Sequence, residues 1–364
     1  MRRFGEGFSL FLDLTRFLSA IVVVIFHAAI PQMGGGWFRA GTIGSDAVMV
    51  FFVLSGFVIA YVSSTKETTF KEYAAARLAR LWSVLLPALI ITYFVDWYGL
   101  TIAPEVYQDW GAWLAADGSP FRLLVSALFV NELWHHSIVP LSNGPVWSIG
   151  FEFWYYIIFA AIIFPAKFRL ALPLAAMIIA GPRILLLFPV WLMGVVAYHV
   201  GSRWPARSSL GISVFCLSLS LLAGCYVLKL NYTLSDVSLR LLGGSIDDWR
   251  YADKFVWSYL CGLLIAAAFV GAWASQDIVL RFIKPFSSAI RHGAGLTLSI
   301  YLFHHPLMLA TSATLDSMAR GPARSALTII ITLMLSCLLG LFFEQQRYPL
   351  RQLLLRAFGN DHGN

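Results

Sequence analysis

The feature that most constrains this chain is the recurrence, along its whole length, of stretches of about 20 mostly apolar residues. Hydrophobic residues make up 59% of the 364 residues and charged residues 12%, about half the charged share of an average soluble protein. No segment shows the alternating pattern of a transmembrane barrel strand. The sequence therefore predicts an all-α fold, a polytopic bundle of transmembrane helices.

We expect ten spans, and we leave out the apolar segment 121–139. That segment turns polar at Asn131 and Glu132 and then carries two histidines, so we interpret it as re-entrant or interfacial. There is no internal repeat, and residues 1–364 are taken as one membrane domain. The spans are expected at residues 8–30, 45–63, 81–99, 146–165, 169–181, 184–200, 209–230, 254–273, 294–315 and 323–343.

The distribution of basic residues predicts the orientation. With the N-terminus inside, 16 Lys and Arg residues fall on the cytoplasmic side and nine outside, as the positive-inside rule requires. Both termini are then cytoplasmic, and we expect a multi-pass protein of the inner (plasma) membrane.

The net charge of +7 comes from basic residues dispersed over these loops rather than from a basic domain, so no nucleic-acid partner is expected. The first stretch is too long and too charged for a cleavable signal peptide.

Three ionisable residues lie inside the first predicted span. Arg16 and His27 are eleven residues apart, just over three helical turns, and therefore share one helix face about 16 Å apart. Asp13 is three residues before Arg16, close enough to pair with it. Ionisable groups at membrane depth usually face a protein interior or a wet cavity. We interpret His27 as a general base, because imidazole can take a proton from a hydroxyl and return it. The alternative is a polar cluster that only ties helices together.

The second span and the segment after it contain two small motifs. Ser55 and Gly56 interrupt a bulky helix and either allow close helix packing or let a ligand approach the backbone. Arg77 and Arg80 are three residues apart at the cytoplasmic surface, where two guanidinium groups can grip a phosphate or simply anchor the helix. Asp46, at the start of the second span, either caps the helix, which is the interpretation we prefer, or takes part in chemistry.

The fourth span begins with a polar and aromatic face. Ser148 and Glu152 are four residues apart, so they share a helix face, with Tyr155 a turn further on and Trp147 beside Ser148. An intramembrane Glu is expensive unless it has a partner. Glu152 is therefore expected to orient His27 or to bind sugar hydroxyls, and the aromatic residues to contact substrate or form an interfacial belt.

The ninth span carries Tyr301, His304 and His305 at spacings that let all three line one cavity. His135 and His136 lie in the excluded segment and are interpreted as a solvated pair. Neighbouring histidines diverge by about 100° on a helix and no carboxylate lies at ligand spacing, so no metal is expected.

Together these motifs resemble acyltransferase family 3, the integral membrane acyltransferases of carbohydrates. The resemblance covers nearly the whole chain, and five motifs occur in the family's order. They are Arg16…His27, Phe51-Phe52-Val53-Leu54-Ser55-Gly56, Arg77-Leu78-Ala79-Arg80, Trp147-Ser148…Glu152 and Tyr301-Leu302-Phe303-His304.

The resemblance implies transfer of an acyl group, usually acetyl, from cytoplasmic acyl-CoA (acetyl-CoA) to a hydroxyl of a cell-surface polysaccharide or lipid-linked glycan. His27 would be the catalytic base and Arg16 its electrostatic partner. Arg77 and Arg80 would lie near the phosphates of CoA. Because no fused extracytoplasmic domain is seen, we expect the chain to handle the acceptor itself.

Several alternatives stay open at this point. Transfer could be direct, or His27 could be acylated first. The buried charges could instead serve a transporter or flippase for an acylated glycan or small metabolite, or only hold helices together. A homodimer is also left open.

Overall fold

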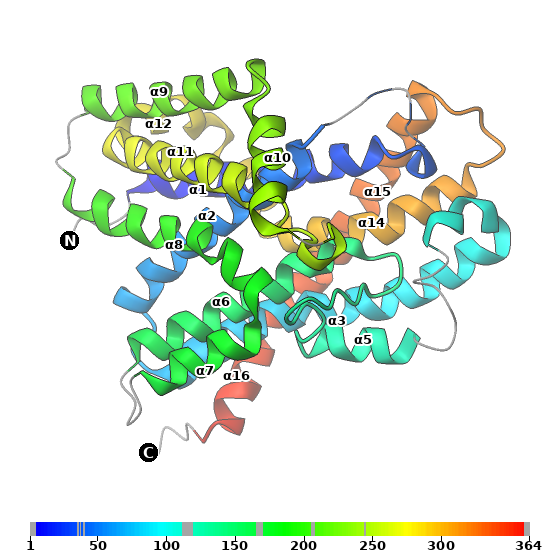
Figure 1. The fold of residues 1–364 in the computed structure, drawn as a ribbon, viewed down its shortest axis with the longest axis horizontal. Coiled ribbons are helices and arrows are strands. Elements are labelled where there is room, and N and C mark those ends of the chain that lie inside the picture. The colour runs from blue at the N-terminus through cyan, green and yellow to red at the C-terminus, as the bar shows by residue number, and fades with distance from the viewer. Residues whose placement is uncertain are drawn as a thin grey trace. The chain divides into compact units, whose positions relative to one another are not determined.

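The computed structural model describes residues 5–34, 36, 38, 41–110, 119–164, 170–204, 208–243 and 245–359, with the backbone alone at 109 and 110. Over these residues the chain forms helices, turns and loops, with no β-strand (Figure 1). The α-helices are α1 (Glu6–Ala28), α2 (Ile43–Thr65), α3 (Phe70–Ile102), α5 (Ser119–Ala127), α6 (Trp147–Ile163), α7 (Ala171–Ala180), α8 (Pro182–Arg203), α9 (Ser208–Val227), α10 (Leu230–Leu242), α11 (Phe255–Ala274), α12 (Gln276–Ile283), α13 (Ser287–Gly295), α14 (Thr297–Thr314), α15 (Pro322–Phe343) and α16 (Arg347–Ala357). The 3₁₀ turns are η1 (Pro31–Met33), η2 (Pro104–Trp110), η4 (Gly144–Val146), η5 (Asp247–Trp249), η6 (Lys284–Phe286) and η7 (Glu344–Gln346).

The prediction of an all-helical membrane protein is confirmed. Within the described residues, eight helices are long and apolar enough to cross a membrane, and each overlaps one of the ten predicted spans. The other two predicted spans are helices outside this set. Helix α7 has only 10 residues, and α14 has 18 but carries two histidines, Pro306 and several hydroxyl side chains. The count of ten therefore stays a prediction.

Helix α3 is longer than the span predicted at 81–99, because it begins eleven residues earlier at Phe70. A capping box fixes that start: Thr69 accepts a hydrogen bond from the backbone N–H of Glu72, whose carboxylate accepts one from the N–H of Thr69. Arg77 and Arg80 consequently lie on the same continuous helix as the apolar span.

The segment 121–139 does not form a spanning helix. Helix α5 has nine residues and ends at Ala127, far short of a membrane crossing. The chain then runs through turns to η4 and α6. Three bulky residues of this connection adopt the left-handed backbone conformation, namely Phe129 (φ 59°), Trp134 (φ 55°) and Leu141 (φ 55°). Such residues carry backbone strain that the surrounding structure must hold in place.

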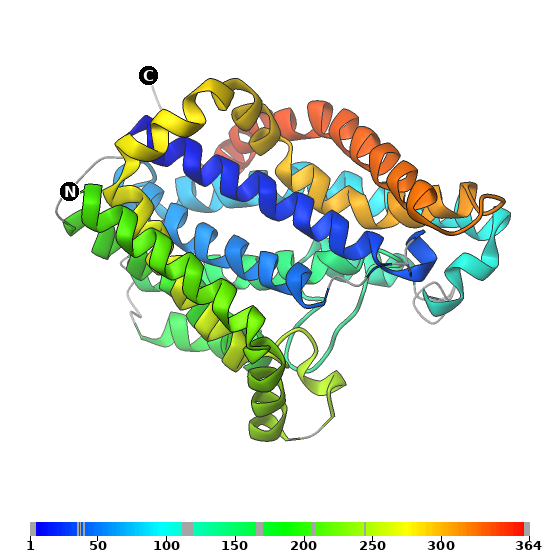
Figure 2. The ribbon, with the colours of Figure 1, turned by 90° about the horizontal axis from the view of Figure 1, so that it is seen from above.

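The chain divides into two compact units, of which the first comprises residues 1–19, 45–68 and 177–294. In this unit α11 packs against α8 and α9, and Figures 1 and 2 show α9 running beside α11. Helix α10 follows α9 after a turn at Lys229 and leaves in a different direction.

Helices α2 and α8 of the first unit approach each other closely. A Cβ atom placed on Gly56 would lie 2.0 Å from the carbonyl oxygen of Trp191, and one on Gly194 would lie 2.0 Å from that of Val53. The indole N–H of Trp191 donates to the hydroxyl of Ser55 over 3.1 Å. The two glycines are therefore required by backbone contact between these helices.

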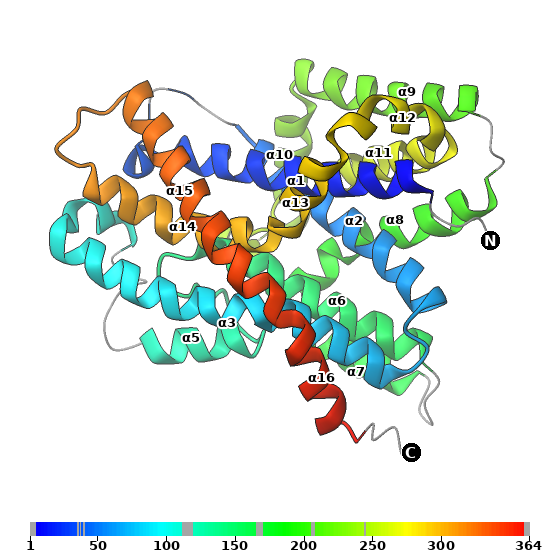
Figure 3. The same ribbon diagram turned by 180° about the vertical axis from the view of Figure 1, so that it is seen from behind.

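The second unit comprises residues 20–44, 69–176 and 295–364. Its centre is α14, which packs against α3 and α15, while α16 packs against α3 (Figure 3). The first turn of α14 is capped from the end of α15, because the carboxylate of Glu344 accepts hydrogen bonds from the N–H (3.1 Å) and the hydroxyl (3.2 Å) of Ser299.

Candidate active site

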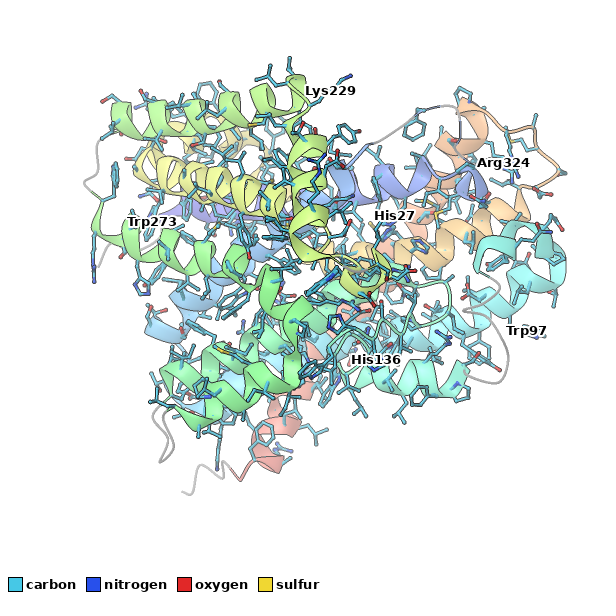
Figure 4. All side chains as sticks on the ribbon, in the orientation of Figure 1. His27, Trp97, His136, Lys229, Trp273 and Arg324 are labelled. Carbon is cyan, nitrogen blue, oxygen red and sulfur yellow. The ribbon has the colours of Figure 1, made fainter. Side chains whose placement is uncertain are left out.

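Three histidines meet in the second unit. His27 lies in the last turn of α1 (Figure 4), and its ring centre is 5.0 Å from that of His304 and 4.8 Å from that of His305, both on α14. His304 and His305 are buried, whereas His27 is partly exposed. The spacing on α14 predicted that both residues could line one cavity, and the structure brings both rings to His27.

Hydrogen bonds fix the tautomers of two of these rings. The Nδ1 atom of His304 lies 2.8 Å from the carbonyl oxygen of Tyr301, which can only accept, so this nitrogen carries the hydrogen. Its Nε2 atom therefore presents a lone pair in the neutral ring and lies 3.0 Å from Nδ1 of His27. His27 must then donate from Nδ1, which also lies 3.1 Å from the carbonyl of Val23. This leaves Nε2 of His27 as its basic nitrogen.

His305 lies against the loop that precedes α6. The backbone of Ser142 lies close to its ring. A Cβ atom placed on Gly144 would lie 4.0 Å from Nε2 of His305, which is ordinary van der Waals contact. The loop 142–145 therefore forms one wall of the histidine cluster.

A buried carboxylate holds that loop from α3. Asp96 is 1% exposed, and it accepts hydrogen bonds from the hydroxyl of Ser142 (2.6 Å) and from its backbone N–H (2.9 Å). Two donors satisfy a carboxylate that would otherwise be costly to bury. Asp96 thus positions the residue whose backbone contacts His305.

The side chain of Asn143 links the same loop to α3 and α14. Its amide nitrogen donates to the hydroxyl of Thr92 over 3.1 Å and to the carbonyl oxygen of Leu302 over 2.9 Å. The residue four positions after Leu302 is Pro306, which has no N–H, so this carbonyl lacks its usual partner within the helix. The proline and the asparagine therefore complement each other beside the histidines.

Tyr301 and Ser148 close the next side of the cluster. Their hydroxyl oxygens are 2.7 Å apart, so one donates to the other, and both lie 3.2 Å from the carbonyl oxygen of Pro145, which can accept the remaining hydrogen. Trp147 lies beside them at the start of α6, with its ring edge-on to Phe151 at 5.1 Å. Ser148 and Tyr301, two of the predicted substrate-binding residues, thereby join the start of α6 to α14.

A second polar group lies further along α6. The guanidinium of Arg77 lies 5.7 Å from the ring centre of Tyr73 and 5.9 Å from that of Tyr156. The hydroxyl of Tyr156 donates to the carboxylate of Glu152 over 2.5 Å. Glu152 was expected to orient His27 or to bind sugar hydroxyls, and in the structure it is hydrogen-bonded to Tyr156. Tyr155 is buried and lies one turn after Phe151. Arg80 lies within electrostatic range of Tyr156 and of Glu344.

Arg16 and Asp13 lie in the first unit, on the earlier turns of α1. Their charged groups are 4.0 Å apart, and Asp13 is also 3.9 Å from the guanidinium of Arg291 on α13. The predicted pairing of Asp13 with Arg16 is present, and Arg291 joins it.

Two further predicted positions also lie in the first unit. Ser55 and Gly56 form the contact of α2 with α8, which supports the packing interpretation over a role in cofactor binding. Asp46 was interpreted as a cap of α2. It lies within the first turn and accepts hydrogen bonds from the indole of Trp257 (2.7 Å) and the hydroxyl of Tyr226 (2.5 Å), so it joins α2 to α9 and α11.

The exposed pair His135 and His136 lies on the loop after α5, as the sequence indicated (Figure 4 labels His136). Among the residues that the structure describes, no group of three or more His, Cys, Asp or Glu side chains is arranged to hold a metal ion.

Sequence reasoning missed Asp96, Ser142, Asn143 and Thr92. One signal was available, because Asp96 is an acid inside the predicted third span and such residues usually have a partner. No spacing rule connects it to Ser142, 46 residues later.

Comparisons with known proteins identify the family of this chain. A family model described as an acyltransferase domain matches residues 9–342. The O-acetyl transferase of Shigella phage Sf6 is 27% identical over 154 residues, 40% of this chain and 43% of that protein. The acyltransferase MdmB of Streptomyces mycarofaciens is 29% identical over 163 residues, 43% of this chain and 38% of that protein.

A third relative, the peptidoglycan O-acetyltransferase OatA of Listeria monocytogenes, is 22% identical over 382 aligned positions, 94% of this chain and 56% of that protein. The chain thus spans about half or less of the length of each of these relatives. No solved structure is significantly similar to it. Since the family model covers nearly all of the sequence, the chain belongs to acyltransferase family 3.

Proposed function

We propose that this protein is a membrane O-acetyltransferase that moves an acetyl group from acyl-CoA to a hydroxyl of a cell-surface glycan. The observation that carries the proposal is the hydrogen-bonded pair of His27 and His304, which leaves one basic nitrogen on a partly exposed ring. The family supports acyl transfer, and two relatives are named as O-acetyl transferases.

The chemistry assigned to His27 is general base catalysis. Its Nε2 atom takes the proton of the acceptor hydroxyl as that oxygen attacks the carbonyl carbon of the thioester. The carbon–sulfur bond then breaks, and the leaving thiolate takes the proton back from His27. The products are an acetyl ester and the free thiol of CoA, and His27 ends in its starting state.

His304 acts as a positioning residue in this scheme. When Nε2 of His27 is protonated, both ring nitrogens carry hydrogens, and Nδ1 still donates to Nε2 of His304. A fixed acceptor at this place stabilises the imidazolium and holds the ring in orientation, as the third member of a catalytic triad does. Here the acceptor is a neutral imidazole whose own hydrogen is held by the carbonyl of Tyr301.

The donor is assigned to the polar group around Arg77. Two arginines three residues apart suit the phosphates of CoA. Ser148, Glu152 and Tyr156 recur every four residues along one face of α6, and Tyr156 is about 12 Å along the helix from Ser148. This face gives a polar route from Arg77 and Tyr156 to Ser148 and Tyr301, next to the histidines. The donor would enter from the cytoplasm and the glycan from outside the plasma membrane.

The test uses cells that make the wild-type protein, His27→Ala or His136→Ala, together with cells that lack the protein. Mass spectrometry of the surface glycans should find acetyl groups for the wild type and for His136→Ala, whose histidine is exposed. His27→Ala should match the cells without the protein while remaining folded in the membrane. Acetylation at the wild-type level by His27→Ala would overturn the assignment.

A further inference from the structure

We propose that the side-chain oxygen of Asn143 is the binding point for a second hydroxyl of the acceptor and thereby selects which sugar position is acetylated. This inference rests on the proposed function. It assigns a polyhydroxyl-binding position to a residue that the acyl-transfer scheme does not use.

The orientation of the Asn143 amide follows from its partners. The carbonyl oxygen of Leu302 can only accept, so the atom 2.9 Å from it must be the amide nitrogen. The hydroxyl of Thr92 donates to the carbonyl of Ala88 over 2.7 Å, and it therefore accepts the second amide hydrogen over 3.1 Å. Both hydrogens of the Asn143 amide are thus used, and its oxygen is defined without ambiguity.

The amide oxygen has no hydrogen-bond partner among the described protein groups, although Asn143 is fully buried. Buried side-chain acceptors are nearly always paired, so this oxygen can take a donor from outside the chain, either a water molecule or a hydroxyl of a ligand. The amide cannot turn over to satisfy this oxygen, because turning would place it against the carbonyl of Leu302. The loop therefore fixes the oxygen as an acceptor for an O–H donor.

The position of Asn143 connects this oxygen to the chemistry. A Cβ atom placed on the next residue, Gly144, would lie 4.0 Å from Nε2 of His305, and the ring centre of His305 is 4.8 Å from that of His27. Asn143 is also bonded to α14 at Leu302, two residues before His304. A sugar carries several hydroxyls, so one can donate to Asn143 while its neighbour is deprotonated by His27. A site built to pair with a hydroxyl discriminates strongly against acceptors that lack it.

The experiment compares Asn143→Ala with Thr92→Val. Thr92→Val removes one partner of the amide nitrogen and leaves the Asn143 oxygen in place, so it is the matched control for simple loosening of the loop. The amount of base-labile acetate on the surface glycan is measured, and NMR identifies which sugar hydroxyl carries it. Binding of CoA to the purified proteins is measured separately as a test of the donor side.

We expect Asn143→Ala to lower acetate at the wild-type position about tenfold, the effect of losing one hydrogen bond to substrate, or to spread acetate over other hydroxyls. With Thr92→Val, acetate should stay at the wild-type position and its amount should fall by less than about threefold. The effect is smaller because only one hydrogen-bond partner of the Asn143 amide nitrogen is removed. CoA should bind both variants as it binds the wild type.

The inference would be overturned if both variants lost the same amount of acetate, or if Asn143→Ala acetylated the same position fully. Asn143 would then only hold the loop in place. If Asn143→Ala does not fold, Asn143→Ser is read in the same way, because its shorter hydroxyl still offers a donor to Leu302. Failure of the proposed function looks different: the wild type would then bind no CoA, or His27→Ala would acetylate normally.

Discussion

At the residue scale, the histidines of the cluster have few possible hydrogen-bonding arrangements, and the proposed mechanism follows from this. The carbonyl of Tyr301 fixes His304, and His304 fixes His27. The sequence predicted His27 as a base from its register with Arg16. It could not predict the partner, because His304 follows 277 residues later and no local rule pairs the two helices.

His304→Ala is expected to lower kcat about ten- to hundredfold and to leave the KM for acyl-CoA unchanged, because the base is retained but no longer oriented. Steady-state kinetics on the purified protein checks this, with His136→Ala as the control. A change in KM alone would place His304 in substrate binding instead.

At the scale of helices, the sequence predicted the apolar spans well because length and hydropathy determine them. It could not separate α7 from a true crossing, and it did not show that α3 extends back to Phe70. The left-handed backbone at Phe129, Trp134 and Leu141 was also invisible, since none of these residues favours it.

Gly56→Ala tests the contact of α2 with α8. The new Cβ would lie 2.0 Å from the carbonyl of Trp191, so the helices must separate, at a cost of about 1–3 kcal/mol in the free energy of unfolding. The thermal midpoint of the purified protein in one detergent should fall. Gly224→Ala is the control, because nothing lies within 4 Å of its Cβ position. Equal midpoints for both variants would contradict the close packing of these helices.

At the scale of the whole molecule, the charge distribution predicts where each loop lies. A single cysteine at His136 should react with a membrane-impermeant maleimide added to intact cells. One at Lys71 should react only after the membrane is opened, because the positive-inside bias places it in the cytoplasm. Both are made in a protein whose four natural cysteines are replaced by serine. The reverse pattern would contradict the predicted orientation.

The family and the membrane fold could be predicted from five short motifs and the hydropathy pattern. The wall of the site could not, because Asp96, Ser142 and Asn143 belong to none of those motifs and meet only when α3, α14 and the loop before α6 pack together. Glu152 is the opposite case, a residue in a visible motif whose contacts could not be predicted. Its motif was visible, but its hydrogen bond to Tyr156 placed it on the donor side of the proposed route.

His27 is proposed to catalyse acetyl transfer from acetyl-CoA to a glycan. Inside-out membrane vesicles that contain the protein and its glycan, supplied with ¹³C-labelled acetyl-CoA at the cytoplasmic face, test it most directly. Labelled, base-labile acetate should appear on the glycan with the wild type and not with His27→Ala at equal protein level. Equal labelling by the two proteins would contradict the account.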